Sequence, residues 1–198
     1  MSQLIYLASA SPRRHQLLEQ IGIIHEVLDI PSPPGEDEPI HSGESPLEYV
    51  QRTALDKAKR ARIWINEQDP SQYDRDRPTL TADTTVALAN LVLGKPADRD
   101  DAVRILSMLA NRDHVVYTAI VLTHRDRQWT DLSTSIVTFG EMTSQDINQY
   151  IDTGEPFGKA GAYGIQGFAA KYIKNINGSY TGIMGLPLYE TSQLLKNL

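Results

Sequence analysis

The stretch LIYLASASPRR, residues 4–14, sets how this chain of 198 residues begins to fold. Its first part, residues 4–8, has the apolar composition of a buried strand. Ser11 and Pro12 then supply an N-cap and a first helical position, and Gly22 can end the helix that follows. The sequence therefore predicts a strand, a tight turn and a helix at this end.

Helix and strand patterns continue along the rest of the chain. Ser45 and Glu48 can form a capping box at the start of a long helix, with Leu47 among the residues that face inward. Asn177 and Gly178 are a hairpin turn signal. The patterns predict strands over residues 25–30, 79–89, 115–123, 130–139 and 168–176, helices over 45–65, 98–109, 143–151 and 186–195, and irregular loops over 31–44 and 67–78.

The length and composition limit the class of protein. A chain of 198 residues can bury one sizeable core or two closely packed lobes, so we expect residues 1–198 to form a single folding unit. No cysteine is present, which excludes disulfides, thiolate nucleophiles and cysteine-ligated zinc. No stretch approaches the ~20 apolar residues of a membrane span, so we expect no membrane partner and a cytoplasmic protein.

The net charge and the missing motifs exclude several functions. A formal net charge of −6 disfavours a nucleic-acid partner, so any polyanion should be small and bound locally. The phosphate-binding loop, the zinc-protease helix and the nucleophile elbow of hydrolases are all missing from the sequence. Residues 161–167, GAYGIQG, precede a predicted strand instead of opening a helix, which argues against a dinucleotide-binding loop.

The turn at residues 8–14 is a candidate anion site. It combines Ser9 and other small residues with the free amides of a helix start and with Arg13 and Arg14. Helix N-termini attract phosphate, and arginine offers it paired hydrogen bonds. The alternative is an ordinary N-cap with two solvated arginines, and this segment alone does not separate the two.

A second group of candidates centres on Asp83. Apolar neighbours predict that Asp83 is buried, so its charge needs a lysine, a metal or a substrate as a partner. Lys95 follows at a turn, and a simple buried pair of Asp83 with a lysine is the alternative. Glu38, in the acidic run 36–38, offers the hard oxygen ligands that Mg²⁺ prefers. Lys57, in the long helix, is unremarkable by itself.

Histidine and aromatic residues give weaker signals. The five histidines show no metal-binding spacing, so none of them is assigned to catalysis. Aromatic residues near the glycine-rich segment can stack on a base, but for most of them core packing is the expected role. These aromatic residues are Tyr163, Phe168, Tyr172 and Tyr180.

Five blocks of the chain together resemble the Maf family, in the same order as in that family. The opening block is LASASPRR, residues 7–14, and the long block EPFGKAGAYGIQG, residues 155–167, is the most specific. The blocks between them are LDKA at 55–58, ADTTV at 82–86 and LGKP at 93–96, and Ser179-Tyr180 and residues 185–187 resemble the family's ending. The resemblance spans nearly the whole chain.

The resemblance implies a fold, an activity and partners. The expected fold is an elongated, two-lobed α/β structure with a mixed sheet, related to the inosine triphosphatase architecture, with the site in a central cleft. The expected activity is a nucleotide pyrophosphatase that depends on Mg²⁺ or Mn²⁺, and the expected assembly is a homodimer. Arg13, Thr84 and Gln166 stand where the family's dTTP/UTP type has arginine, threonine and glutamine, so the expected substrate is a pyrimidine nucleoside triphosphate.

Some positions depart from the family pattern. Gly158 stands where aspartate is frequent, residues 111–112 replace a usual Ser-Gly, and Gly182 replaces a common asparagine. Residues 67–78 resemble an insertion before the Asp83 strand. None of these changes removes an expected catalytic residue.

The resulting hypothesis gives each candidate a role. Glu38 and Asp83 hold the metal, and Asp83 activates the attacking water, directly or through the metal. Ser9, Arg13, Lys57 and Lys95 bind the triphosphate, and Thr84 and Gln166 complete the substrate site. Two alternatives stay open, a nucleotide-sensing regulatory protein linked to division arrest and a phosphatase that releases orthophosphate.

Overall fold

The computed structural model describes residues 4–31 and 38–198, and within these residues seven strands form one mixed sheet. The sheet order is β2-β1-β3-β5-β6-β7, and β4 pairs with β3 outside this path. β1 is parallel to β2 and β3, whereas the other pairings are antiparallel. The strands are β1 (Ile5–Leu7), β2 (His25–Val27), β3 (Thr79–Leu88), β4 (Leu91–Leu93), β5 (Asp113–His124), β6 (Arg127–Phe139) and β7 (Ile173–Asn177).

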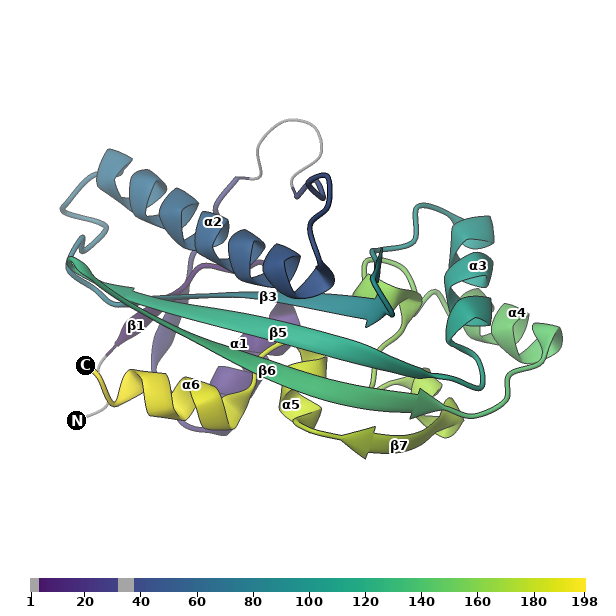
Figure 1. Cartoon of the computed structure of the whole chain (residues 1–198). Coiled ribbons are helices and arrows are strands. Elements are labelled where there is room, and N and C mark those ends of the chain that lie inside the picture. The colour runs from purple at the N-terminus through teal and green to yellow at the C-terminus, as the bar shows by residue number, and fades with distance from the viewer. Residues whose placement is uncertain (1–3, 32–37) are drawn as a thin grey trace.

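Helices cover both faces of the sheet. α2 lies across one face of β3 and β5, and α1, α5 and α6 lie on the other side (Figure 1). The helices are α1 (Pro12–Gln20), α2 (Pro46–Glu67), α3 (Arg99–Leu109), α4 (Ser144–Asp152), α5 (Tyr180–Met184) and α6 (Leu188–Leu195), with short 3₁₀ helices η1 (Ala160–Ala162) and η2 (Phe168–Tyr172). Among the described helices, none is long and apolar enough to cross a membrane. The predicted α/β class and its mixed sheet are confirmed.

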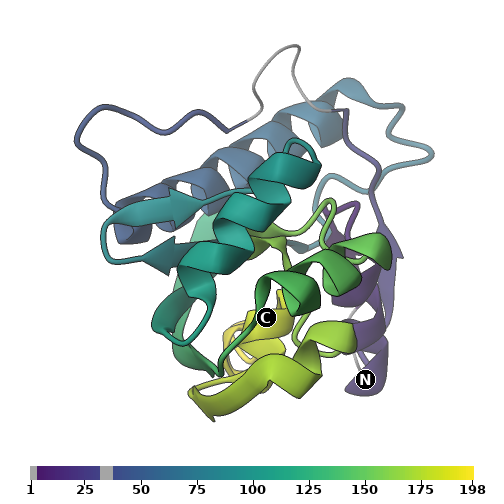
Figure 2. The same ribbon diagram turned by 90° about the vertical axis from the view of Figure 1, so that its right-hand side faces the viewer.

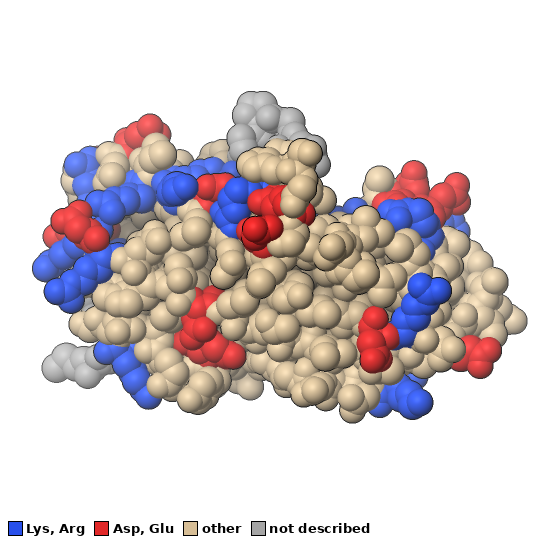
Figure 3. Space-filling view, viewed as in Figure 1, with Lys and Arg blue, Asp and Glu red and all other residues tan. Residues whose placement is uncertain are grey.

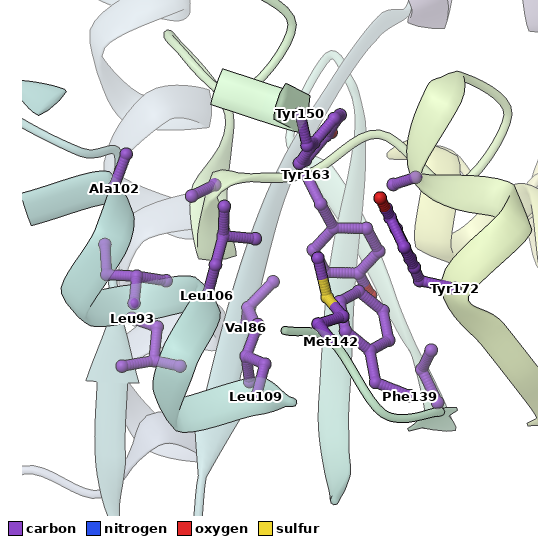
Figure 4. Close-up of a cluster of buried hydrophobic side chains, with 14 of the residues drawn as sticks. Val86, Leu93, Ala102, Leu106, Leu109, Phe139, Met142, Tyr150, Tyr163 and Tyr172 are labelled. Carbon is purple, nitrogen blue, oxygen red and sulfur yellow. The ribbon is translucent and has the colours of Figure 1, made fainter. Parts of the chain in front are cut away.

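Separate hydrophobic clusters occupy the two ends of the long strands. At one end, Leu80 and Ala82 of β3 pack with residues of β1, α1 and α6. At the other end, Val86 of the same strand packs with α3, α4 and the 160–172 segment. Figure 2 shows α3 and α4 in front of the sheet at this end, and Figure 4 shows Val86, Leu106 and Tyr163 in its cluster. Asp83 therefore lies on β3 between two packed bodies, as the expected two-lobed arrangement requires.

The long helix begins as the sequence predicts. The side chain of Ser45 accepts a hydrogen bond from the amide of Glu48, and the Glu48 carboxylate accepts one from the amide of Ser45. The inward face of α2 differs by one residue from the expectation, because Leu47 is 38% exposed. Its place in the first turn points it away from the sheet, whereas Tyr49 and Val50 are buried.

The C-terminal third contains the largest errors of the sequence prediction. Residues 168–172, expected as strand, form η2, because the amides of Phe168 and Ala169 donate to the carboxylate of Glu155 and not to a neighbouring strand. Gly178 does not lead into a hairpin, since Ser179 caps α5 immediately after it. A Cβ at Gly178 would lie 2.6 Å from Oγ of Ser135, so this glycine permits close strand packing.

Candidate active site

The candidate residues meet in one pocket. A cavity of about 710 Å³ lies between the two clusters, at the level of the middle of β3. It is bounded by the β1–α1 turn, by α2, by the segment after β4 and by residues 158–166. All eight candidates from the sequence line it: Ser9, Arg13, Glu38, Lys57, Asp83, Thr84, Lys95 and Gln166.

Lys57 joins the two candidate carboxylates. Its Nζ lies 2.5 Å from Oε1 of Glu38 and 2.6 Å from Oδ1 of Asp83. α2 brings Lys57 over β3, while Glu38 reaches the same point from the segment before the helix, where its backbone carbonyl accepts from the hydroxyl of Tyr49 at 3.0 Å. The buried Asp–Lys pair expected as an alternative thus exists, but its lysine is Lys57 and not Lys95.

Asp83 is an ionised acceptor in a buried place. Burial raises its pKa and is the largest influence, but the charge and hydrogen bond of Lys57, the charge of Arg14 and a hydrogen bond from Thr53 together bring the pKa below its ordinary value. The side chain is 7% exposed, and Thr85 donates to its Oδ2 at 3.3 Å. At neutral pH the carboxylate is therefore charged and able to accept a proton or bind a cation.

Arg14 was named with Arg13 in the candidate anion site, but the hypothesis gave it no role of its own. It donates to the backbone carbonyl of Gly185 at 2.8 Å, to Oγ of Ser9 at 3.0 Å and to Oγ1 of Thr84 at 3.3 Å. Burial is the first cause that lowers the pKa of its guanidinium, and the charge of Asp83 opposes it. The one available signal was its place beside Arg13 in the first turn of α1, and the two side chains donate to the neighbouring carbonyls of Met184 and Gly185.

Arg13 and the start of α1 form one part of the pocket lining. Arg13 donates from Nε to the carbonyl of Met184 at 3.2 Å. Ser11 occupies the N-cap position, as expected, yet among the described residues its side chain makes no capping hydrogen bond. The hydroxyl of Ser9 instead accepts from the amide of Ser11 at 3.3 Å. The first-turn amides of α1 therefore border the pocket without a side-chain cap.

Lys95 and Gln166 also line the pocket. Both are exposed, and neither has a hydrogen-bond or ion-pair partner within the described residues. Gln166 sits in the glycine-rich segment, which β3 fixes in place, because a Cβ at Gly161 would lie 2.8 Å from Cγ1 of Val86 and φ of Gly161 is +69°. The side chains of Lys95 and Gln166 are thus available to bind a ligand, and the backbone that carries Gln166 is held against β3.

Glu155, at the start of the glycine-rich segment, is hydrogen-bonded to the residue that follows this segment and to Tyr150 of α4. Its carboxylate accepts from the hydroxyl of the buried Tyr150 at 2.7 Å and from the amide of Phe168 at 2.8 Å. The same hydroxyl accepts from the amide of Gly164 at 3.3 Å, and Nζ of Lys159 donates to the backbone carbonyl of Glu155. Both ends of the segment that carries Gln166 are therefore tied to one carboxylate, a role that the sequence did not reveal.

The charges of the pocket favour a polyanion. Among the described lining residues, six cationic side chains surround two carboxylates, those of Glu38 and Asp83. The six are Arg13, Arg14, Lys57, Arg60, Lys95 and Lys159. This excess of positive charge contrasts with the net charge of −6 of the chain. A local anion site inside an acidic protein is what the sequence predicted.

The donor set fits a divalent cation that is shared with a ligand. Mg²⁺ is usually held by one or two carboxylates and completes its shell with water and substrate phosphates. Glu38 and Asp83 provide two convergent carboxylates, but the described residues contain no group of three or more His, Cys, Asp or Glu that could hold a metal. Glu36 and Asp37 of the acidic run lie outside the described residues.

Known proteins resemble this chain over nearly its whole length. A curated relative from Bordetella pertussis, named dTTP/UTP pyrophosphatase, is 53% identical over 98% of this chain and 91% of its own length. Relatives of the same name from Bordetella avium and Cupriavidus metallidurans are 54% and 46% identical, over 97% and 99% of this chain and 94% and 97% of their own lengths.

A solved dITP/XTP pyrophosphatase from Mycobacterium abscessus is 13% identical, with a TM-score of 0.40 over 71% of this chain and 76% of that chain. This likeness is too low to support a conclusion. The sequence model described as Maf-like protein matches residues 4–198. The chain therefore belongs to the Maf-like protein family.

Proposed function

We propose that this protein is a nucleoside triphosphate pyrophosphatase that hydrolyses dTTP and UTP to the nucleoside monophosphate and pyrophosphate. The observation that carries the proposal is the carboxylate pair of Glu38 and Asp83 in a pocket that six cationic side chains also line. Relatives named dTTP/UTP pyrophosphatase, about half identical over nearly the full length, support it. The cavity of about 710 Å³ is large enough for a nucleotide.

Mg²⁺ or Mn²⁺ is the proposed cofactor, and Glu38 and Asp83 are the residues that would hold it. When bound, such an ion polarises phosphoryl oxygens and neutralises charge that develops in phosphoryl transfer. Lys57 lies between the two carboxylates, so its ammonium group would have to release them for a divalent cation to be held there, and a phosphate of the ligand would be its new partner. The same side chain can thus serve both as counterion and as phosphate ligand.

Asp83 is the proposed general base. The water oxygen forms a bond to the α-phosphorus, the bond from that phosphorus to the bridging oxygen breaks, and pyrophosphate leaves with the bond's electron pair. Asp83 accepts the proton of the water, which its low pKa permits because it is ionised at neutral pH. Arg13 and Lys95 face the same cavity and can neutralise the departing pyrophosphate.

Gln166 is proposed to select the base. Its amide can donate to a pyrimidine carbonyl and accept from the ring N–H, a pattern that uracil and thymine share and cytosine lacks. The free position of Gln166 at the pocket edge supports this role. Arg13 and Thr84 are proposed to complete the specificity set, and Arg14 fixes the hydroxyl of Thr84.

The homodimer is proposed on the family resemblance alone, and the location and the absence of a nucleic-acid partner on composition and net charge. We expect a homodimer in the cytoplasm, with no nucleic-acid partner. Analytical ultracentrifugation of the full chain measures the first directly, and a monomer at micromolar concentration would contradict it.

Hydrolysis in ¹⁸O-labelled water tests the proposed reaction. The label should appear in the nucleoside monophosphate, since water attacks the α-phosphorus. Label in pyrophosphate, or orthophosphate as the first product, would contradict α–β cleavage. Binding of UTP without turnover in the presence of Mg²⁺ or Mn²⁺ would favour the nucleotide sensor instead.

A further inference from the structure

A second hollow lies at the end of the molecule where α2 ends and β5 turns into β6. Its volume is about 430 Å³, and it shares no described lining residue with the active-site pocket. Four guanidinium groups and two carboxylates are among its described lining residues. Figure 3 shows Lys and Arg side chains gathered at this end of the molecule.

Two of the four arginines are fixed in place. Arg75 donates to the carbonyls of Asn66 at 2.8 Å and Gln68 at 3.4 Å, where α2 ends. Arg77 lies 4.4 Å over the ring of Tyr6 and pairs with Glu26 at 2.5 Å. Within the described residues Arg75 has no carboxylate partner, so it contributes a positioned and uncompensated positive charge.

The other two arginines are only loosely engaged. Arg62 pairs with Asp126 at 3.2 Å, and that carboxylate is 98% exposed. Arg125 pairs with Asp76 at 3.8 Å, and both side chains are about two thirds exposed or more. Exposed ion pairs of this kind contribute little to stability, so an incoming anion can replace either aspartate at little cost.

The arginines come from three separate segments of the chain. Arg62 belongs to α2, Arg75 and Arg77 to the segment before β3, and Arg125 to the β5–β6 turn. The middle segment, residues 67–78, is the insertion-like stretch that the active-site pocket does not use. Only the folded chain brings these guanidinium groups around one hollow, which distinguishes the cluster from a run of charges in sequence.

We propose that this hollow is a second anion site, which binds a small phosphorylated ligand with at least two negative charges. Guanidinium groups recognise phosphate oxygens through paired hydrogen bonds, and the neutral side chains of Asn66 and Thr123 add polar groups to the lining. The volume falls within the range of small-molecule sites. The flanking Asp76 and Asp126, on a chain of net charge −6, disfavour an extended nucleic acid.

Calorimetric titration of the full chain with inorganic pyrophosphate, without added metal, tests the proposal. Pyrophosphate is also the proposed product at the active-site pocket, so the data are fitted to two sites, and the affinities below are those of the hollow. The Lys95→Gln variant should keep this binding, because Lys95 belongs to the other pocket. The double variant Arg62→Gln/Arg125→Gln should bind at least ~10-fold more weakly, since two charged hydrogen-bonding groups are lost. Both side chains are more than half exposed, so the fold should be retained.

Arg127→Gln is the matched control. Arg127 is exposed, begins β6 on the same turn and does not line the hollow, so its loss removes one positive charge, against two in the double variant, and should leave pyrophosphate affinity within ~2-fold. Unchanged affinity in the double variant, or an equal loss in Arg127→Gln, would overturn the proposal. Binding that disappears entirely in Lys95→Gln would place the ligand in the active-site pocket and overturn it too. Tighter, variant-sensitive binding of a single-stranded oligonucleotide would assign the surface to nucleic acid.

Discussion

Replacing Lys57 with methionine separates its two proposed roles. Methionine keeps most of the length and apolar stem of the side chain but removes the charge that lies 2.5 Å from Glu38 and 2.6 Å from Asp83. The carboxylates of Glu38 and Asp83 are then left close together without the cation between them. Without a divalent cation the variant should be less stable than the parent protein, and with one it should recover.

The expected magnitudes follow from the burial of the groups. Removing one partner of a fully buried ion pair costs about 3–5 kcal/mol. Because Glu38 is 26% exposed and the charge of Arg14 still acts on Asp83, we expect a loss of about 2 kcal/mol, which lowers the melting temperature by about 4–8 °C in a chain of this size. Charges ~4 Å apart interact by ~4 kcal/mol at an effective dielectric constant of 20, so Mn²⁺ affinity should rise at least ~10-fold.

Electron paramagnetic resonance of free Mn²⁺ measures that affinity directly, without nucleotide and without turnover. Thermal unfolding with and without Mn²⁺ gives the recovery of stability. Lys95→Met is the matched control, because Lys95 lines the same pocket but contacts neither carboxylate. If Lys57→Met binds Mn²⁺ no more tightly than the parent or the Lys95 variant, the idea that the ammonium group competes with the cation is refuted.

Four further outcomes are expected. Asp83→Asn should fold normally and lose at least ~100-fold in kcat for UTP, and a near-normal kcat would remove the residue from the base role. Gln166→Glu should narrow the ratio of kcat/KM between UTP and CTP more than it changes Mn²⁺ binding, and an unchanged base ranking would contradict its assignment. Glu155→Gln replaces the carboxylate that accepts from the backbone amides of Phe168 and Ala169 with a weaker acceptor, so it should raise KM for UTP more than it lowers kcat. Circular dichroism checks that the variant is folded. Burial lowers the pKa of His114 from 6.5 to about 4, so as the pH falls the unfolded state binds a proton at this histidine before the folded state does. The free energy of unfolding should therefore fall by about 3 kcal/mol as the pH drops from 6.5 to 4. Chemical denaturation at a series of pH values should show this fall in the parent protein and its loss in His114→Gln.

The sequence predicted the elements that local chemistry determines. The capping box at Ser45 and Glu48 is satisfied as expected, and the buried Asp83 needed and found a cationic partner. Seven of the eight candidate residues belong to the resembling blocks, which lie at turns, on α2 and in the middle of β3, and Glu38 comes from the acidic run before α2; all eight line one cavity. Patterns within a few residues predicted the cap and the buried charge, whereas the site residues also needed the resemblance along the whole chain.

The errors concern contacts between distant parts of the chain. Residues 168–172 alternate like a strand, but the carboxylate of Glu155 captures their first amides, and no local pattern reveals that competition. Arg14 received no role of its own because two of its partners, Thr84 and Gly185, are 70 and 171 residues away. Lys95 seemed the natural partner of Asp83 by proximity in sequence, whereas the packing of α2 on β3 supplies Lys57.

The hydrogen bonds from Arg13 and Arg14 to the carbonyls of Met184 and Gly185 also have a consequence for biogenesis. Each spans 171 residues, so the arginine wall of the pocket is held in place only after α5 has docked. Contacts of such separation close late, because a long loop must be ordered before they form. A nascent chain on the ribosome therefore carries its aspartate and lysines well before it has a formed site, and turnover begins only when synthesis has passed residue 185.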